Sequence, residues 1–246
     1  MSFSSYVELD YGAEKKTSTT SIGNLSLGTR GTTPDGRVFR YSLAGEAIGA
    51  GKLAQDPLAV ANEDMDLAVQ AAGAVGDTSV SVTTGGAVAV DLYAEGYLYI
   101  NDDAGEGHMY RVKGNTVTSG SATMTVTLAA GETVAVALTT SSLAGLKKNP
   151  YNGALLYNTT PDGIARGVAP TDVANAEYFW SQTWGEAAVW VQGTVVLGQA
   201  VVPSTNTSGA VDAHVGTGDD NANVGVVCSP ISVTTDYGHI FLTIAP

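Results

Sequence analysis

The sequence predicts an all-β protein, a β-barrel or sandwich, and three observations support this. Apolar and polar residues alternate at residues 78–84 (TSVSVTT) and 122–128 (ATMTVTL), as they do in half-buried strands. Turn-forming Gly, Pro, Asp and Asn residues recur about every 8–12 positions, the spacing typical of barrels and sandwiches. A mildly helical composition is confined to residues 58–72 (LAVANEDMDLAVQAA), where a strand or loop fits equally well.

The order of these patterns predicts three parts. Residues 1–30 are polar and rich in Ser, Thr and Gly, so we expect an extended N-terminal arm that lies on its own barrel or on a neighbouring subunit. Residues 76–140 contain enough strand and turn signals for a self-contained unit. We therefore expect a small β subdomain at 76–140, inserted into a discontinuous base domain of residues 31–75 and 141–246.

The base domain begins with a predicted hairpin. The Pro34-Asp35-Gly36 turn precedes a strand at residues 37–43, and the chain returns over residues 47–55. The inserted unit is then expected to contain about six strands. These lie at residues 78–84, 88–93, 97–101, 108–113, 122–128 and 133–139.

The C-terminal part is organised around residues 177–202 (EYFWSQTWGEAAVWVQGTVVLGQAVV), the longest apolar block. Trp180 and Trp184, with Tyr178, fall at period two and are expected to share one face of a strand. That aromatic face could fill a core, bind a ligand or meet another protein. Of the three, Trp184 is expected to be the most exposed, because it lies at the predicted strand end.

Glycines are expected to divide this apolar block into separate strands. Gly185-Glu186 is expected to end the first strand, and further strands are expected at residues 187–191 and 195–202. Residues 155–158 are expected to form a short strand before this block. The closing strands are expected at residues 224–229 and 237–244.

Composition limits the class of partner. Charged residues make up 14% of the chain, below the roughly 25% of ordinary soluble domains. The surface is therefore either rich in Thr, Ser and Gly or buried against other subunits. The formal net charge of −13, from 11 basic and 24 acidic residues, disfavours nucleic acid and anionic membranes as partners.

The single cysteine, Cys228, excludes an intrachain disulfide and is expected to be a small buried hydrophobe within VGVVCSPI. The first residues have neither the basic nor the apolar segment of a signal peptide. No apolar run approaches the roughly 20 residues of a membrane span. We expect the protein to be made and kept in a cytoplasm, or to leave it by another route than secretion.

The sequence contains no pattern typical of an enzyme, and we predict no catalytic, cofactor-binding or metal-binding residues. Among the histidines, only His214 lies in a predicted loop with acidic residues nearby, and no G-x-S-x-G motif or P-loop spacing occurs. The acidic loops at residues 101–106 and 219–221 lack the EF-hand spacing and are typical of solvated turns. Paired carboxylates of a glycosidase, or tryptophans of a glycan-binding module, remain alternatives.

Several segments, in a fixed order, resemble a family of tailed-bacteriophage virion proteins. The resemblance covers most of the chain from about residue 31. The segments are GDTSV (76–80), YAEGYLYINDDAGEGHMYRVKGN (93–115), ATMTVTL (122–128), LKKNPYNG (146–153), YFWSQTWGEAAVWVQGTVVLGQAVVPS (178–204) and VGVVCSPISVTTDYGHIFLTI (224–244).

The resemblance implies a capsid decoration, or cement, protein. Such a protein would bind the outside of the mature phage head and tie neighbouring capsomers together, with the major capsid protein and its own homotrimer as partners. It would be assembled in the host bacterial cytoplasm. The alternatives are a tail, neck or fibre protein of the virion, and a glycan-binding module or glycosidase.

We expect the interface to involve the aromatic face and the start of the arm. The arm would cross to a neighbouring subunit or to the capsid protein. The candidate interface residues are Tyr178, Trp180, Trp184, Tyr6, Leu9 and Tyr11.

Overall fold

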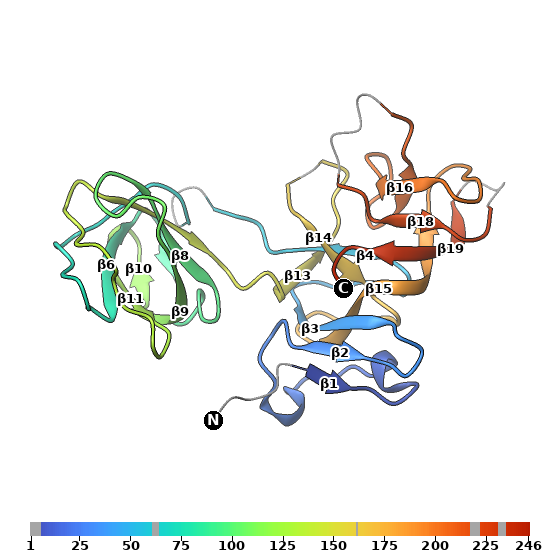
Figure 1. Ribbon diagram of the computed structural model, residues 1–246, viewed down its shortest axis with the longest axis horizontal. Helices are drawn as coiled ribbons and strands as arrows, with labels where there is room; N and C mark the ends of the chain where they lie inside the picture. The colour runs from blue at the N-terminus through green and yellow to red at the C-terminus, as the bar shows by residue number, and fades with distance from the viewer. Residues whose placement is uncertain (1–5, 61–63, 161, 217–221, 231–234) are drawn as a thin grey trace. The chain divides into compact units, whose positions relative to one another are not determined.

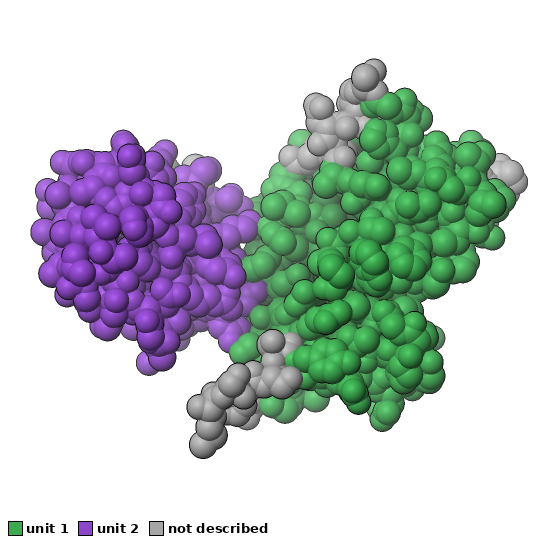
Figure 2. Space-filling model, in the orientation of Figure 1, with its two compact units in different colours: residues 1–58, 150–246 green, residues 59–149 purple. Residues whose placement is uncertain are grey.

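The structure, a computed structural model, describes residues 6–60, 64–160, 162–216, 222–230 and 235–246, and it is all-β as predicted (Figure 1). Its strands form an 11-stranded sheet, a 6-stranded sheet and a 2-stranded ribbon. The chain divides into two compact units (Figure 2). Unit 1 comprises residues 1–58 and 150–246, and unit 2 comprises residues 59–149.

Unit 2 extends beyond the predicted limits of 76–140 on both sides. It includes β5 (Leu67–Ala68) and β12 (Leu143–Lys147), which pair with each other inside its sheet. Neither strand shows the alternation that marks the others, because β5 is only two residues long and β12 is mostly apolar. Hydrogen bonding across the sheet, which the local pattern does not encode, sets the boundary.

Unit 2 contains a six-stranded sheet in the order β5-β12-β8-β9-β11-β6. The amide of Gln70 donates to the carbonyl of Ser81 at 2.8 Å, and Val69 bridges Val82, so the two outer strands meet. A core of alternating side chains fills the interior. The remaining strands of the unit are β6 (Ser79–Thr84), β7 (Ala87–Val88), β8 (Tyr97–Asp102), β9 (Met109–Asn115), β10 (Thr118–Ser119) and β11 (Ala122–Leu128).

The predicted strand at residues 133–139 is wrong. Val134 and Leu138 are buried, which accounts for the apolar alternation of TVAVALT. Their backbones are bonded at separate points, Val134 to Gly76 and Asp77 and Leu138 to Gly73. Two buried side chains, whose backbones are bonded at separate points, thus give the apolar alternation of a strand although no strand forms.

Unit 1 contains two closed rings of strands that share one member, β15 (Tyr178–Val191). The first ring runs β3-β13-β4-β14-β15 and closes through the β3–β15 pairing. Its interior holds Phe179, Ile48 and several alanines. The other strands of this ring are β3 (Val38–Ala44), β4 (Leu53–Gln55), β13 (Asn152–Leu156) and β14 (Ala165–Val168).

The second ring runs β15-β17-β16-β18-β19 and closes through the β15–β19 pairing. Its core consists mainly of valines, with Ile240 and Leu242 fully buried. The other strands are β16 (Ala200–Pro203), β17 (Val211–Ala213), β18 (Gly225–Val227) and β19 (Asp236–Thr243).

The predicted break at Gly185-Glu186 is wrong, because β15 continues through it. Gly185 has φ +89°, a left-handed conformation that a glycine adopts without steric cost. At this point β15 exchanges partners: its pairing with β3 ends at Trp184, where its pairing with β19 begins. Gly185 therefore bends the strand from one ring into the other. The strand predicted at residues 195–202 is likewise shorter, because β16 begins at Ala200.

The described part of the predicted arm, residues 6–30, folds onto unit 1. β1 (Tyr6–Glu8) pairs parallel with β2 (Arg30–Thr32), which pairs antiparallel with β3. Two short 3-10 helices, Ala13–Lys15 and Ile22–Asn24, lie between them. The described part of this segment therefore lies on its own subunit, which is one of the two expected arrangements. Residues 1–5 lie outside the described residues.

Candidate interaction site

The N-terminal segment covers an aromatic cluster on β3 and β15. The rings of Tyr41 and Tyr178 are stacked with centroids 5.5 Å apart, and Trp180 lies 5.1 Å from Tyr41. Leu9 packs into this cluster, and the amide of Ile22 donates to the Tyr41 hydroxyl at 2.8 Å. Trp180 is therefore part of the core of its own chain, and Tyr178 is half-buried at its margin.

Gly31 allows this close packing. A Cβ atom at Gly31 would lie 2.7 Å from Leu9 Cδ1 and 2.8 Å from Trp180 Cζ3. Both distances are shorter than carbon–carbon contact, so β1 can approach the cluster only because position 31 lacks a side chain. Single apolar residues in a polar segment, such as Leu9, thus become core residues.

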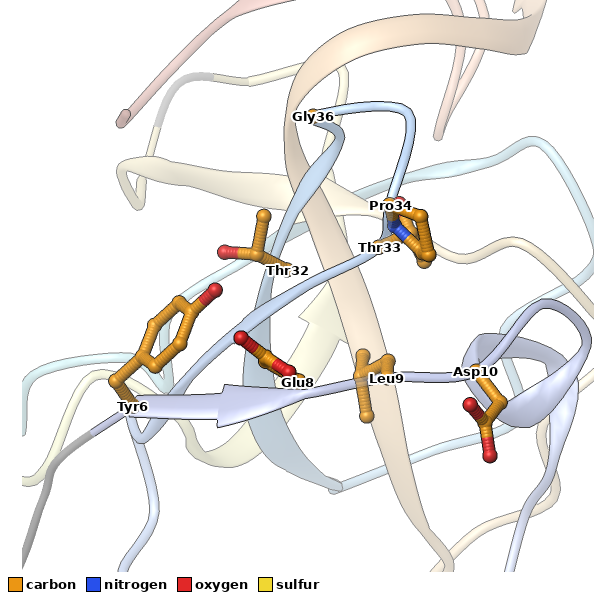
Figure 3. Close-up of a pocket in the computed structure, with 8 residues that line it drawn as sticks. All are labelled: Tyr6, Glu8, Leu9, Asp10, Thr32, Thr33, Pro34 and Gly36. Carbon is orange, nitrogen blue, oxygen red and sulfur yellow. The ribbon is translucent and has the colours of Figure 1, made fainter.

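Residues of β1, β2 and the segments that follow them line a hollow of about 430 Å³ (Figure 3). The parallel register places Glu8 beside Thr32 and Tyr6 beside Arg30, whose guanidinium carbon is 5.9 Å from the ring centroid. Figure 3 shows Tyr6, Glu8 and Thr32 side by side, whereas the Asp10 carboxylate points away from them. The hollow thus joins an aromatic ring, a carboxylate and a hydroxyl.

Several groups of this hollow lack partners among the described residues. The Thr32 hydroxyl oxygen is buried and forms no hydrogen bond within that part of the chain. Glu8 and Asp10 form no ion pair with any described residue. The hollow is consequently acidic and retains unused hydrogen-bonding capacity.

β1 is also the first strand of its sheet. It pairs with β2 on one side and with no described strand on the other. Tyr6 is 40% exposed, and Tyr11, just beyond the strand, is 64% exposed. An open strand edge flanked by exposed aromatic rings is a surface on which another chain can pair.

Trp184 lies apart from the other candidate interface residues. It is half-exposed on the outer face of the second ring, as Tyr178 also is at its own position, and it lies within β15 rather than at the strand end expected from the sequence. Its ring meets Phe241 edge-on at 5.5 Å. Beside it, His239 Nε2 lies 2.6 Å from a Glu186 carboxylate oxygen. The structure therefore gathers Leu9, Tyr178 and Trp180 at one place, with Trp184 at another.

Trp190 lies further along the same outer face. Lys52 Nζ lies 3.8 Å from the centroid of its indole, and burial lowers the pKa of that ammonium group. The Tyr237 ring meets the same indole edge-on at 4.8 Å. Trp190 is thus covered by neighbours of its own chain.

Cys228 is half-buried rather than buried as the sequence predicts. Burial raises the pKa of its thiol, and the hydrogen bond and charge of Glu186 raise it further. The thiol therefore stays protonated at neutral pH. It lacks the electropositive surroundings of a reactive cysteine.

The acidic loop at residues 101–106 forms turns. Asp102 and Asp103 each accept a backbone amide of the following residue, at 2.9 Å and 2.8 Å, and Asn101 bonds to Asp66. Among the described residues no group of three or more His, Cys, Asp or Glu side chains is placed to hold a metal ion. The second loop, residues 219–221, lies outside the described residues.

Within the described ranges no helix is long and apolar enough to cross a membrane. Comparison of the chain with protein-family models, with curated proteins and with solved structures finds no match.

Proposed function

We propose that this protein is a capsid decoration protein of a tailed phage and that it binds the mature head through the β1 edge. The observation that carries the proposal is the open edge of β1 with Tyr6 and Tyr11 exposed beside it. The ordered resemblance of its segments to phage virion proteins supports the choice of partner. The protein would be assembled in the bacterial cytoplasm and retained on the virion surface.

The edge supplies two kinds of contact. The backbone of β1 can form a ladder with an extended segment of the major capsid protein, because no described strand pairs with its other side. Tyr6 and Tyr11 can act as rigid anchors, because tyrosine buries a large area with little loss of side-chain entropy. Many such modest contacts, repeated by capsid symmetry, would resist the internal pressure of packaged DNA.

Charge suggests the character of the capsid surface. Glu8 and Asp10 have no ion-pair partner among the described residues, and the chain carries a net charge of −13. A basic segment beside the capsid strand would complement them and speed association. Self-association as a homotrimer would use a different surface, and the half-exposed pair Trp184 and Phe241 is the candidate.

The test uses phage heads that lack the protein. Heads are incubated with purified protein, and bound protein is measured by gel densitometry and by density on the shell. The double variant Tyr6→Ser/Tyr11→Ser is expected to lower the affinity by about 30-fold or more, as loss of an interface anchor does. The control Tyr99→Ser alters a ring of similar exposure, 37%, in unit 2 and is expected to bind normally.

Undiminished binding by the double variant would refute the β1 edge as the contact. Copy number in purified particles separates the shell from the tail. Hundreds of copies agree with decoration of the head, whereas a handful would assign the protein to the tail, neck or fibre. The mass of the protein in solution tests the trimer.

A further inference from the structure

A second hollow, of about 350 Å³, lies in unit 1 away from the β1 edge. Residues from β15, β19 and the N-terminal segment line it, so segments far apart in the sequence build it together. Its volume is near the lower end of the roughly 300–1,000 Å³ range of small-molecule sites. The lining residues with polar or aromatic side chains are Lys15, Arg37, Gln182, Glu186 and Tyr237.

Gln182 supplies a fixed acceptor in this hollow. It is only 3% exposed, and its amide nitrogen donates to the carbonyls of Trp184 at 3.2 Å and Glu186 at 2.9 Å. With both donors used, the side-chain oxygen is oriented, and it has no hydrogen-bond partner among the described residues. An oriented acceptor that is open to the hollow and has no partner within the described chain can accept a hydrogen bond from a ligand.

Tyr237 supplies a fixed aromatic surface. Its ring meets Trp190 edge-on at 4.8 Å, and its hydroxyl donates to the Ala50 carbonyl at 3.1 Å. Gly51 lies beneath the ring, because a Cβ there would come within 2.6 Å of it. Although the ring is held on these sides, Tyr237 remains 48% exposed. The exposed part is free to receive a ligand without a loss of side-chain freedom.

The charges around the hollow largely neutralise one another. Arg37 lies 3.4 Å from Glu14 and 2.8 Å from Asp35, and Glu186 is paired with His239. Lys15 is exposed and forms no ion pair with a described residue. The hollow therefore offers hydrogen-bond donors and acceptors together without a strong field of either sign.

We propose that this hollow binds the ring of a neutral sugar, a single pyranose. The positively polarised C–H face of the sugar would stack on Tyr237, whose π face is negative. Its hydroxyls would donate to Gln182 and Glu186 and accept from Lys15 and Arg37. This binding site is independent of the capsid contact, because it involves neither Tyr6 nor Tyr11.

The test is an NMR titration of the full-length, ¹⁵N-labelled protein with the methyl glycosides of glucose, galactose, mannose and N-acetylglucosamine. At least one is expected to shift the amides around Gln182, Ala188 and Tyr237 in a saturable manner. The variant Ala188→Tyr fills the hollow without removing a buried group, because Ala188 is exposed. It is expected to weaken binding by about tenfold or more.

The control Ala87→Tyr changes an exposed strand alanine of unit 2 and is expected to leave binding unchanged. Titration with a bacterial-surface polysaccharide that contains the active sugar distinguishes a polymer ligand from a free one. Absence of saturable shifts at the hollow with every glycoside overturns the proposal. Shifts that persist in Ala188→Tyr overturn it as well.

Discussion

The carboxylate of Glu14 lies 3.4 Å from the guanidinium of Arg37 and is only 3% exposed. Its other oxygen accepts the amide of Gly12 at 2.6 Å, so one side chain fastens the N-terminal segment to the loop before β3. Glu14→Gln removes the charge and weakens both bonds. We expect a loss of about 1–3 kcal/mol in the free energy of unfolding, because a charged hydrogen-bonding group is buried here.

Denaturant unfolding measures this loss. The matched control is Glu8→Gln in β1, since Glu8 is exposed and forms no ion pair with a described residue. Its effect is expected to stay within about 0.5 kcal/mol. Equal stability of the two variants would show that the Glu14–Arg37 contact does not hold the segment.

The bend of β15 at Gly185 gives a second prediction. Gly185→Ala places a side chain at φ +89° and 3.1 Å from Arg37 Cγ. We expect destabilisation by about 2–3 kcal/mol from backbone strain and crowding. Gly198→Ala, at φ +79° with no atom within 4 Å, should cost only about 1 kcal/mol. The denaturant midpoints of the two variants measure this difference in stability. Equal losses of stability would show that crowding against Arg37 adds nothing to the cost at position 185.

The raised pKa of Cys228 predicts slow alkylation. Below that pKa the thiolate fraction is smaller than in an ordinary thiol, so iodoacetamide should react more slowly than with glutathione across neutral pH. Glu186→Gln removes the nearby charge, lowers the pKa and should raise the rate by roughly two- to tenfold. His239→Gln keeps that charge and should give no increase. The alkylation rate of each variant is measured as a function of pH. Identical profiles for Glu186→Gln and His239→Gln would contradict the effect of the Glu186 charge on the Cys228 thiol.

Unit 2 should fold by itself. Residues 59–149 have their own sheet and apolar core. We expect the isolated fragment to give dispersed NMR spectra and a cooperative thermal transition. Met124→Ala, which alters a fully buried side chain, should lower its stability by about 2–5 kcal/mol. A spectrum of an unfolded chain would show that the unit depends on the remainder of the protein.

Local alternation predicted those strands whose two faces differ. Residues 122–128 form β11 as expected, because Met124 and Val126 face the core while the threonines between them are more exposed. Alternation predicts a strand wrongly where the buried side chains do not belong to one, as at Val134 and Leu138. It also fails at β5, whose two residues are too short for any period to appear.

Glycine explains the error in β15. A glycine can end a strand or bend it, and the sequence does not distinguish the two outcomes at Gly185. The hollow around Gln182 and Tyr237 could not be predicted either. Its residues are separated by up to most of the chain length, and they come together through the pairings of β15 with β14 and β19 and the packing of the N-terminal segment.

The shared strand β15 also determines how the protein would respond to mechanical force. The hydrogen bonds of its antiparallel ladders with β3 and β19 run across the strand direction. Tension along β15 therefore loads these bonds in shear, so that many must break at once, whereas peeling from one end would break them singly. A subunit pulled along this strand would therefore extend little before it yields.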